Sequence, residues 1–197
     1  MWRHGLKRGS RKRRPLTAGV FLLAILLFAN PAFGRSYKSV LKEWTRQGRV
    51  HTLDNLEMKM SWHATYQASP MRKARLEKMA GLLEWSEGEQ KNQWDRDEKD
   101  LLKFDEFFVA IYAGSSGDRS FGQETGLWRL VLETDGKRIE PTRFERAKIS
   151  EIDRSLYPYL DKWSKGFWIR FPKSIRPDEP FSLRMLGVPA KSELVWK

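Results

Sequence analysis

Apolar and polar residues alternate strictly between positions 56 and 66. The apolar positions are Leu56, Met58, Met60, Trp62, Ala64 and Tyr66. A period of two is typical of a β-strand that buries one face, so the pattern predicts a strand over these residues. At about 3.3 Å per residue this strand would be about 36 Å long, and we expect it to bend or to carry a β-bulge. Residues 37–47 before it have the pattern of a short amphipathic helix that ends at Gly48.

After residue 68 the apolar residues follow the spacing of helices. Ser69 and Pro70 have the form of an N-cap followed by proline at the first helical position. A single helix over residues 70–103 would be about 50 Å long, which is too long for a domain of this size. Ser86 and Glu89 fit a capping box, which predicts that a second helix starts there. The sequence therefore predicts a helical hairpin over residues 70–103, inserted after the first strand.

Six further strands are predicted after the helical insertion. They cover residues 107–112, 127–133, 137–144, 166–171, 181–186 and 192–196. The first of them is continuously apolar, which favours a central strand covered on both faces. Asp135 and Gly136 provide the positive φ angles of a tight hairpin turn, and residues 147–155 have the pattern of a linker. Seven strands joined by turns suit two packed sheets, so we predict a mainly β fold with a helical insertion, an immunoglobulin-like antiparallel β-sandwich.

The first 34 residues have the composition of a secretion signal. Seven basic residues and no acidic residue occupy the first 14 positions, and an uncharged run that is apolar except for Thr17 follows from Leu16 to Ala29. This run is shorter than the roughly 20 residues of a membrane-spanning helix. Ala32 and Gly34 place small residues three and one positions before a cut, as signal peptidase requires. We expect cleavage between Gly34 and Arg35, and an uncleaved membrane anchor is the alternative.

Cleavage would change the charge of the chain and hence its expected partners. The full sequence has 37 Lys and Arg against 25 Asp and Glu, a net charge of +12, and the loss of seven basic residues leaves +5. Much of the excess therefore belongs to the targeting segment, and the composition does not favour a nucleic-acid partner. The remaining chain is predicted to consist of an N-terminal helix and lead-in at 35–55 and a sandwich domain at 56–197.

The sequence contains no pattern that assigns catalysis. It has no cysteine, which excludes disulfides, thiolate nucleophiles and thiolate metal ligands. The histidines His4, His51 and His63 are not spaced as a metal cluster. The acidic run that begins at residue 95 resembles the start of a calcium loop, but Lys99 and Asp100 occupy positions where that loop needs an oxygen ligand and a glycine. The sequence therefore assigns no catalytic residue, no metal ligand and no cofactor.

Tryptophan is unusually frequent, and eight of the nine lie after position 34. Trp62 and Trp128 share the parity of apolar neighbours, which predicts that both are buried. Trp168 has the opposite parity to Phe167 and Ile169, which favours exposure. Exposed aromatic rings stack on sugar rings, whereas the alternative is packing in the core. The candidate aromatic binding face consists of Tyr157, Tyr159, Trp163 and Trp168.

A further set of residues carries a resemblance between this chain and a known group of proteins. They are Phe107 to Tyr112, Leu127 to Leu130, Asp135-Gly136, Pro141, Tyr157 to Tyr159, Trp163 and Phe171-Pro172. Through them the chain resembles small exported bacterial proteins of unknown function, over roughly residues 56–172. These are turn and core residues, so the resemblance implies export and a single β-sandwich domain and assigns no catalytic residue.

We therefore expect an exported, non-enzymatic envelope protein, periplasmic or secreted, that binds or supports another envelope protein or a glycan. The alternative is a secreted carbohydrate-binding module or hydrolase accessory that uses the aromatic face. No nucleic acid is expected as partner. Contact with a membrane is expected only through the N-terminal segment, if that segment stays uncleaved.

Overall fold

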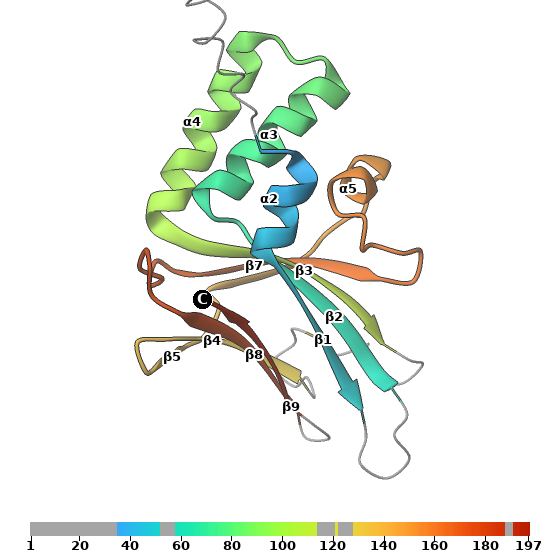
Figure 1. Cartoon of the computed structure of the whole chain (residues 1–197), viewed down its shortest axis with the longest axis vertical. Coiled ribbons are helices and arrows are strands. Elements are labelled where there is room, and N and C mark those ends of the chain that lie inside the picture. Colours follow the sequence, from blue (N-terminus) through green and yellow to red (C-terminus); the bar gives the residue numbers. More distant parts are fainter. Residues whose placement is uncertain (1–34, 52–57, 114–120, 122–127, 188–190) are drawn as a thin grey trace, which may run out of the picture. The chain divides into compact units, whose positions relative to one another are not determined.

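Two antiparallel β-sheets pack face to face, and helices cover the outer face of the larger sheet (Figure 1). The computed structural model describes residues 35–51, 58–113, 121, 128–187 and 191–197. The residues from Arg35 onward form one compact unit. The predicted secretion signal, which ends at Gly34, lies outside the described residues.

The two sheets contain nine strands among the described residues. The larger sheet has the order β1-β2-β3-β7-β6, and the smaller one has the order β5-β4-β8-β9. The larger sheet consists of β1 (Thr45–His51), β2 (Met58–Tyr66), β3 (Phe104–Ala113), β7 (Lys165–Pro172) and β6 (Arg143–Arg146). The smaller sheet consists of β5 (Lys137–Ile139), β4 (Trp128–Thr134), β8 (Phe181–Gly187) and β9 (Lys191–Trp196). All neighbouring strands are antiparallel.

The main core lies between the two sheets and is rich in aromatic residues. Trp62 of the larger sheet and Leu132 of the smaller one are both fully buried in it. Trp62 Nε1 donates to Ser192 Oγ at 2.9 Å, and Trp196 Nε1 donates to the carbonyl of Trp44 at 3.0 Å. Because the polar N–H of each ring has an acceptor, both tryptophans enter the core without an unsatisfied donor.

Helices and the larger sheet enclose a second core. The helices are α2 (Tyr37–Trp44), α3 (Ser69–Leu83), α4 (Glu87–Lys103) and α5 (Glu151–Leu156). Along β3, Phe107 and Val109 point into the main core, whereas Phe108 and Ala110 point into the second core. This confirms that the continuous apolar run of β3 forms a central strand covered on both faces. No helix among the described residues is long and apolar enough to cross a membrane.

The two sheets and the helices confirm the predicted mainly β sandwich with a helical insertion. The immunoglobulin-like part of the prediction is not confirmed. Here β1, β2 and β3 are neighbours in one sheet, whereas immunoglobulin domains place their third strand in the opposite sheet. The helical hairpin follows the second strand, because the mostly polar residues 45–51 form a strand that their pattern does not predict.

The N-terminal lead-in is part of the larger sheet. The predicted helix over 37–47 ends at Trp44, and β1 then pairs with β2 from Thr45 to His51. Gly48 allows this pairing, because a Cβ atom there would lie 2.4 Å from Trp62 Nε1. The sandwich therefore includes residues that were predicted to precede it.

Two segments between β4 and β7 differ from the prediction. The strand predicted over 137–144 divides into β5 and β6, which belong to different sheets. The linker predicted over 147–155 contains most of α5, which begins after a capping box between Ser150 and Asp153. The predicted turn and the predicted hairpin helix are confirmed: Asp135 and Gly136 have φ angles of 51° and 67°, and α4 begins after a capping box at Ser86.

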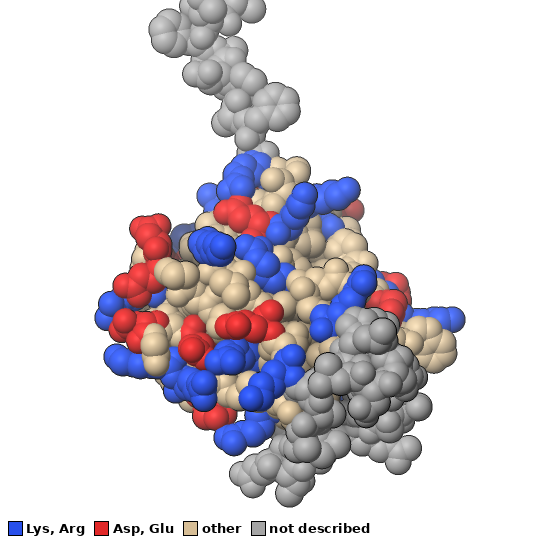
Figure 2. Space-filling view, turned by 60° about the horizontal axis from the view of Figure 1, so that its bottom comes forward, with Lys and Arg blue, Asp and Glu red and all other residues tan. Residues whose placement is uncertain are grey.

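Charged residues of both signs cover the outer surface. Figure 2 shows Lys and Arg side chains interspersed with Asp and Glu side chains on the face that it displays. On the smaller sheet, Arg184 Nη1 lies 2.7 Å from Glu133 Oε2, and the hydrogen bond from Arg184 lowers the pKa of Glu133. Arg129 Nη2 lies 2.9 Å from Glu140 Oε1. Such paired surface charges are typical of a solvated face.

Candidate functional site

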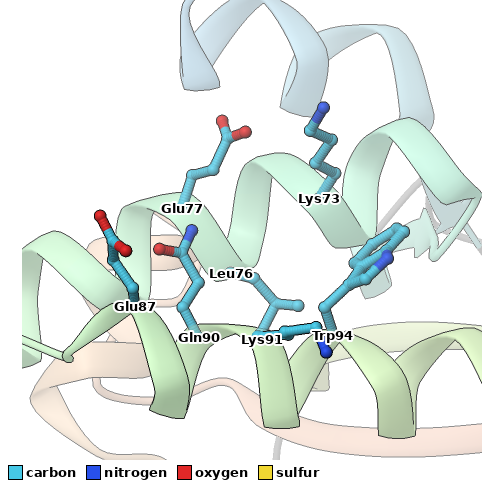
Figure 3. Close-up of a pocket in the computed structure, with 7 residues that line it drawn as sticks. All are labelled: Lys73, Leu76, Glu77, Glu87, Gln90, Lys91 and Trp94. Carbon is cyan, nitrogen blue, oxygen red and sulfur yellow. The ribbon is translucent and has the colours of Figure 1, made fainter.

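A pocket of about 350 Å³ lies between α3 and α4 (Figure 3). Its lining residues are Lys73, Leu76 and Glu77 of α3 and Glu87, Gln90, Lys91 and Trp94 of α4. Buried Leu76 and half-buried Trp94 provide its apolar surface. Because the two helices are antiparallel neighbours, side chains from both form its walls. We call this pocket the α3–α4 groove.

Charges of opposite sign lie at opposite ends of the α3–α4 groove. Figure 3 shows Lys73 and Lys91 on the side of Trp94, and Glu77 and Glu87 toward the other end. None of these four charged residues forms an ion pair with another residue that the structure describes. The groove therefore presents two cations and two anions that are available to a partner, around an apolar floor.

The end of α3 extends the apolar surface of the groove. Leu83 lies seven residues after Leu76, so both occupy one face of the helix. Leu82 and Leu83 are 47% and 42% exposed. Scattered exposed leucines are ordinary, but these two adjoin a helix pair whose groove is also apolar. The helical hairpin thus leaves one side without a covering element among the described residues.

A buried network of charges fixes the helical hairpin to the larger sheet. Arg72 of α3 is 1% exposed. Its Nη2 lies 3.2 Å from Glu106 Oε2 on β3, and its Nη1 lies 3.7 Å from Asp97 Oδ1 on α4. Its Nε donates to the carbonyl of Gln67 at 2.9 Å. One arginine thus joins α3, α4 and β3 beneath the helices.

Two further arginines complete the network. Arg75 Nη2 lies 2.8 Å from Asp97 Oδ2, and Arg170 contacts Glu106 at 2.5 Å and Asp100 at 2.9 Å. Burial lowers the pKa of Arg75, but Tyr157, Asp97 and Glu106 outweigh it and raise the pKa overall. Three arginines thus face three carboxylates, and each of these carboxylates has a cationic partner. This pairing assigns the network a structural role, because no carboxylate in it is left as a free base.

The structure brings three of the four predicted aromatic residues together, but not as an exposed face. Tyr157 has no exposed surface, and its ring stacks on Phe108 with centroids 4.1 Å apart. Trp168 is half-buried under α3, where Arg75 lies 5.3 Å from its ring centroid. The predicted exposure of Trp168 is wrong, because helices that parity does not reveal cover this face of β7.

Tyr159 and Trp163 have different surroundings. The half-buried ring of Tyr159 stacks on His63 with centroids 4.7 Å apart, and its hydroxyl lies 2.7 Å from Thr65 Oγ1. Trp163 is 67% exposed. Since Tyr157 is inaccessible and Trp168 lies under α3, only Trp163 presents most of its ring to a ligand. The four rings do not form one binding surface.

No metal site emerges from the described residues. No group of three or more His, Asp or Glu is placed to hold a metal ion within them. His63 stacks on Tyr159, and burial lowers its pKa, helped by nearby Arg49. No family model matches the chain, and no curated protein or solved structure matches it either. Geometry and chemistry alone therefore carry the functional interpretation.

Proposed function

We propose that this protein is an exported, non-enzymatic component of the bacterial envelope that binds another envelope protein in the α3–α4 groove. The observation that carries the proposal is the groove itself, a pocket of about 350 Å³ with an apolar floor, whose four charged wall residues have no ion-pair partner in the described part of the chain. Recognition of an amphipathic helix by a hydrophobic groove is a recurring binding mode. The signal-like first 34 residues and the resemblance to small exported bacterial proteins support the location.

The charges of the groove indicate the partner's chemistry. Lys73 and Lys91 favour acidic residues at one end of the bound segment, and Glu77 and Glu87 favour basic residues at its other end. Apolar residues at every third or fourth position of the partner would contact Leu76 and Trp94. The proposed partner is therefore an amphipathic helix with separated charges, bound in one direction.

A glycan-binding role on the predicted aromatic face has less support. Stacking on a sugar needs accessible ring faces, and Tyr157 is fully buried. In the buried network, Asp97, Asp100 and Glu106 all pair with arginines, so none of these three is a free acid or base for glycoside hydrolysis. Protein binding by the groove is therefore the better supported function.

Crosslinking in the intact cell tests this proposal. A photoreactive amino acid at position 91 should give a specific adduct with one envelope protein, whereas the same amino acid at exposed position 137 on the opposite sheet should not. The crosslinked segment is then synthesised as a peptide. Because Trp94 provides apolar contact and Lys73 and Lys91 provide charge, Trp94→Ala and Lys73→Glu/Lys91→Glu should each weaken its binding about tenfold or more.

Charge reversal in the peptide provides the matched control. A second peptide carries basic residues in place of the acidic ones that face Lys73 and Lys91. This peptide should bind the Lys73→Glu/Lys91→Glu protein more tightly than it binds the wild-type protein. Both variants should keep the wild-type circular dichroism. Lys73 and Lys91 are exposed, so their variant should also keep the unfolding midpoint, whereas Trp94→Ala removes a half-buried ring and should lower it, and its binding is measured well below that midpoint. The proposal would be overturned if positions 91 and 137 gave the same adduct in the same yield. It would also be overturned if neither variant changed the affinity for the peptide.

A further inference from the structure

A second, larger hollow lies at the edge of the larger sheet, where β6 ends and β7 begins. It has a volume of about 550 Å³ and is lined by residues 146–149 and 164–166. The backbone N–H of Ala147 donates to the carbonyl of Gly166 at 2.9 Å. This hydrogen bond joins the two lining segments next to the paired strands β6 and β7. We call this site the basic hollow.

The basic hollow is lined by cations without any acidic residue. Arg146, Lys148 and Lys165 contribute its three charged side chains. No described carboxylate forms an ion pair with Arg146 or Lys148. On the same strand, Arg143 is paired with Glu145 at 2.5 Å, so its charge is already balanced. Two adjacent cations without a carboxylate partner, in a concave site, favour an anionic ligand.

The floor of the basic hollow is apolar and closely packed. Half-buried Ala147 and Ile149 provide its apolar side chains. A Cβ atom at Gly166 would lie 2.5 Å from Ile149 Cδ1 and 3.0 Å from Phe108 Cζ, so the absence of a side chain there is needed for this packing. A ligand in the hollow would therefore contact both apolar surface and charge.

Trp163, whose ring is exposed, directly precedes the lining residues Ser164 and Lys165 in the sequence. Trp163 presents two-thirds of its surface, and Lys162 Nζ lies 4.9 Å from its ring centroid. Asp161 fixes this turn, because its Oδ1 accepts from the backbone N–H of Trp163 at 2.8 Å and of Ser164 at 2.6 Å. A ring on a backbone fixed in this way is partly preorganised for contact.

We propose that the basic hollow binds an anionic saccharide. Its carboxylate or phosphate would face Arg146 and Lys148, and the apolar face of a sugar ring would stack on Trp163. A free anion would use only the cations, whereas a neutral sugar would use only the ring and the apolar floor. This proposal is independent of the α3–α4 groove, since it uses none of the same residues.

Calorimetry of the chain from residue 35 to 197 with defined oligosaccharides tests the proposal. An oligogalacturonate should bind at least tenfold more tightly than a neutral galactose oligomer of equal length. A phosphorylated mannose oligomer in a second titration shows whether carboxylate or phosphate is preferred. Arg146→Glu/Lys148→Glu and Trp163→Ala should each weaken binding of the preferred oligomer about tenfold. The surface control Lys137→Glu and the groove variant Trp94→Ala should leave it unchanged.

Three results would overturn the proposal. If both charged oligomers bind the Arg146→Glu/Lys148→Glu variant as tightly as the wild type, the anionic group binds elsewhere. Inorganic polyphosphate that binds as tightly as the preferred oligomer, with no effect of Trp163→Ala, would show a site for anions without sugar recognition. Affinity for the neutral oligomer equal to that for both charged ones would show that the cations take no part. Wild-type circular dichroism of each variant confirms that a loss of binding is not a loss of fold.

Discussion

Asp105 shows how a single buried charge is accommodated in the fold. It lies on β3 and is fully buried. Tyr66 Oη donates to its Oδ1 at 2.8 Å, and the backbone N–H groups of Ser174 and Ile175 donate to its Oδ2 at 2.6 and 2.8 Å. Lys173 Nζ adds a contact at 2.8 Å. The carboxylate thus fixes the segment after β7 to the central strand.

Replacing Asp105 should destabilise the domain strongly. Asp105→Ala removes the acceptor of four donors, namely the Tyr66 hydroxyl, the Lys173 ammonium and two backbone N–H groups. Each buried donor left unsatisfied costs about 1 to 3 kcal/mol. We therefore expect the free energy of unfolding in urea to fall by about 3 kcal/mol or more. Asp105→Asn keeps one acceptor oxygen and should lose less. Exposed Glu140→Ala should change the value by less than about 0.5 kcal/mol, and equal effects of Asp105→Ala and Glu140→Ala would contradict this role.

His63 should make the stability depend on pH. Burial, followed by the charge of Arg49, lowers its pKa below the ordinary value of 6.5, while Asp161 opposes this shift. The unfolded chain therefore binds a proton more readily, and the contribution of neutral His63 is fully present above pH 6.5 and is lost as the pH falls below it. The unfolding midpoint in urea should decrease from pH 7.5 to 5.5 more steeply in the wild type than in His63→Gln. Identical slopes would show that His63 titrates normally in the fold.

At the scale of elements, local patterns predicted most of the structure correctly. The alternation before Tyr66, the capping box at Ser86 and the turn at Asp135 all correspond to elements of the structure. These features depend on a few neighbouring residues, so a sequence reveals them. The continuous apolar run of β3 also predicted that both faces of the strand are covered. Successive residues of a strand point to opposite faces, so consecutive apolar residues place apolar side chains on both faces.

The elements that the sequence did not reveal depend on distant contacts. β1 is mostly polar, and it forms because its backbone pairs with β2 and because Gly48 fits against Trp62. β6 leaves the hairpin of β4 and β5 to pair with β7 in the other sheet. Trp168 was predicted as exposed because parity reports the two faces of a strand and not what covers each of them. Tertiary context decided all three cases.

At the scale of the whole molecule, the candidate sites were the least predictable feature. The α3–α4 groove needs two helices side by side, and the sequence shows only their separate charge patterns, with Lys73 and Glu77 on α3 and Glu87 and Lys91 on α4. The basic hollow joins residues 146–149 to residues 164–166 across a predicted linker. Of the four residues of the predicted aromatic face, only Trp163 is exposed in the fold. Surfaces of this kind arise from topology and cannot be read from composition.

Export is the last property to test, because the proposed partner of the α3–α4 groove is an envelope protein. The fold gives a reason to expect that cleavage after Gly34 leaves the domain intact. Ser36 is the N-cap of α2, and its Oγ accepts from the backbone N–H of Ser39 at 3.3 Å, so a mature chain that begins at Arg35 keeps the whole helix and its cap.

Fractionation of the producing cell with N-terminal sequencing should therefore recover a soluble envelope protein that begins at or near Arg35. A large residue directly before the cut blocks signal peptidase, so Gly34→Leu should accumulate as a membrane-bound precursor with residues 1–34 attached. Gly81→Leu, far from the cut in an open helical position, is the control and should be processed normally. A wild-type chain that stays in the membrane fraction with its N-terminus intact would contradict cleavage. The domain would then be tethered, and its partner for the α3–α4 groove would have to lie within reach of that membrane.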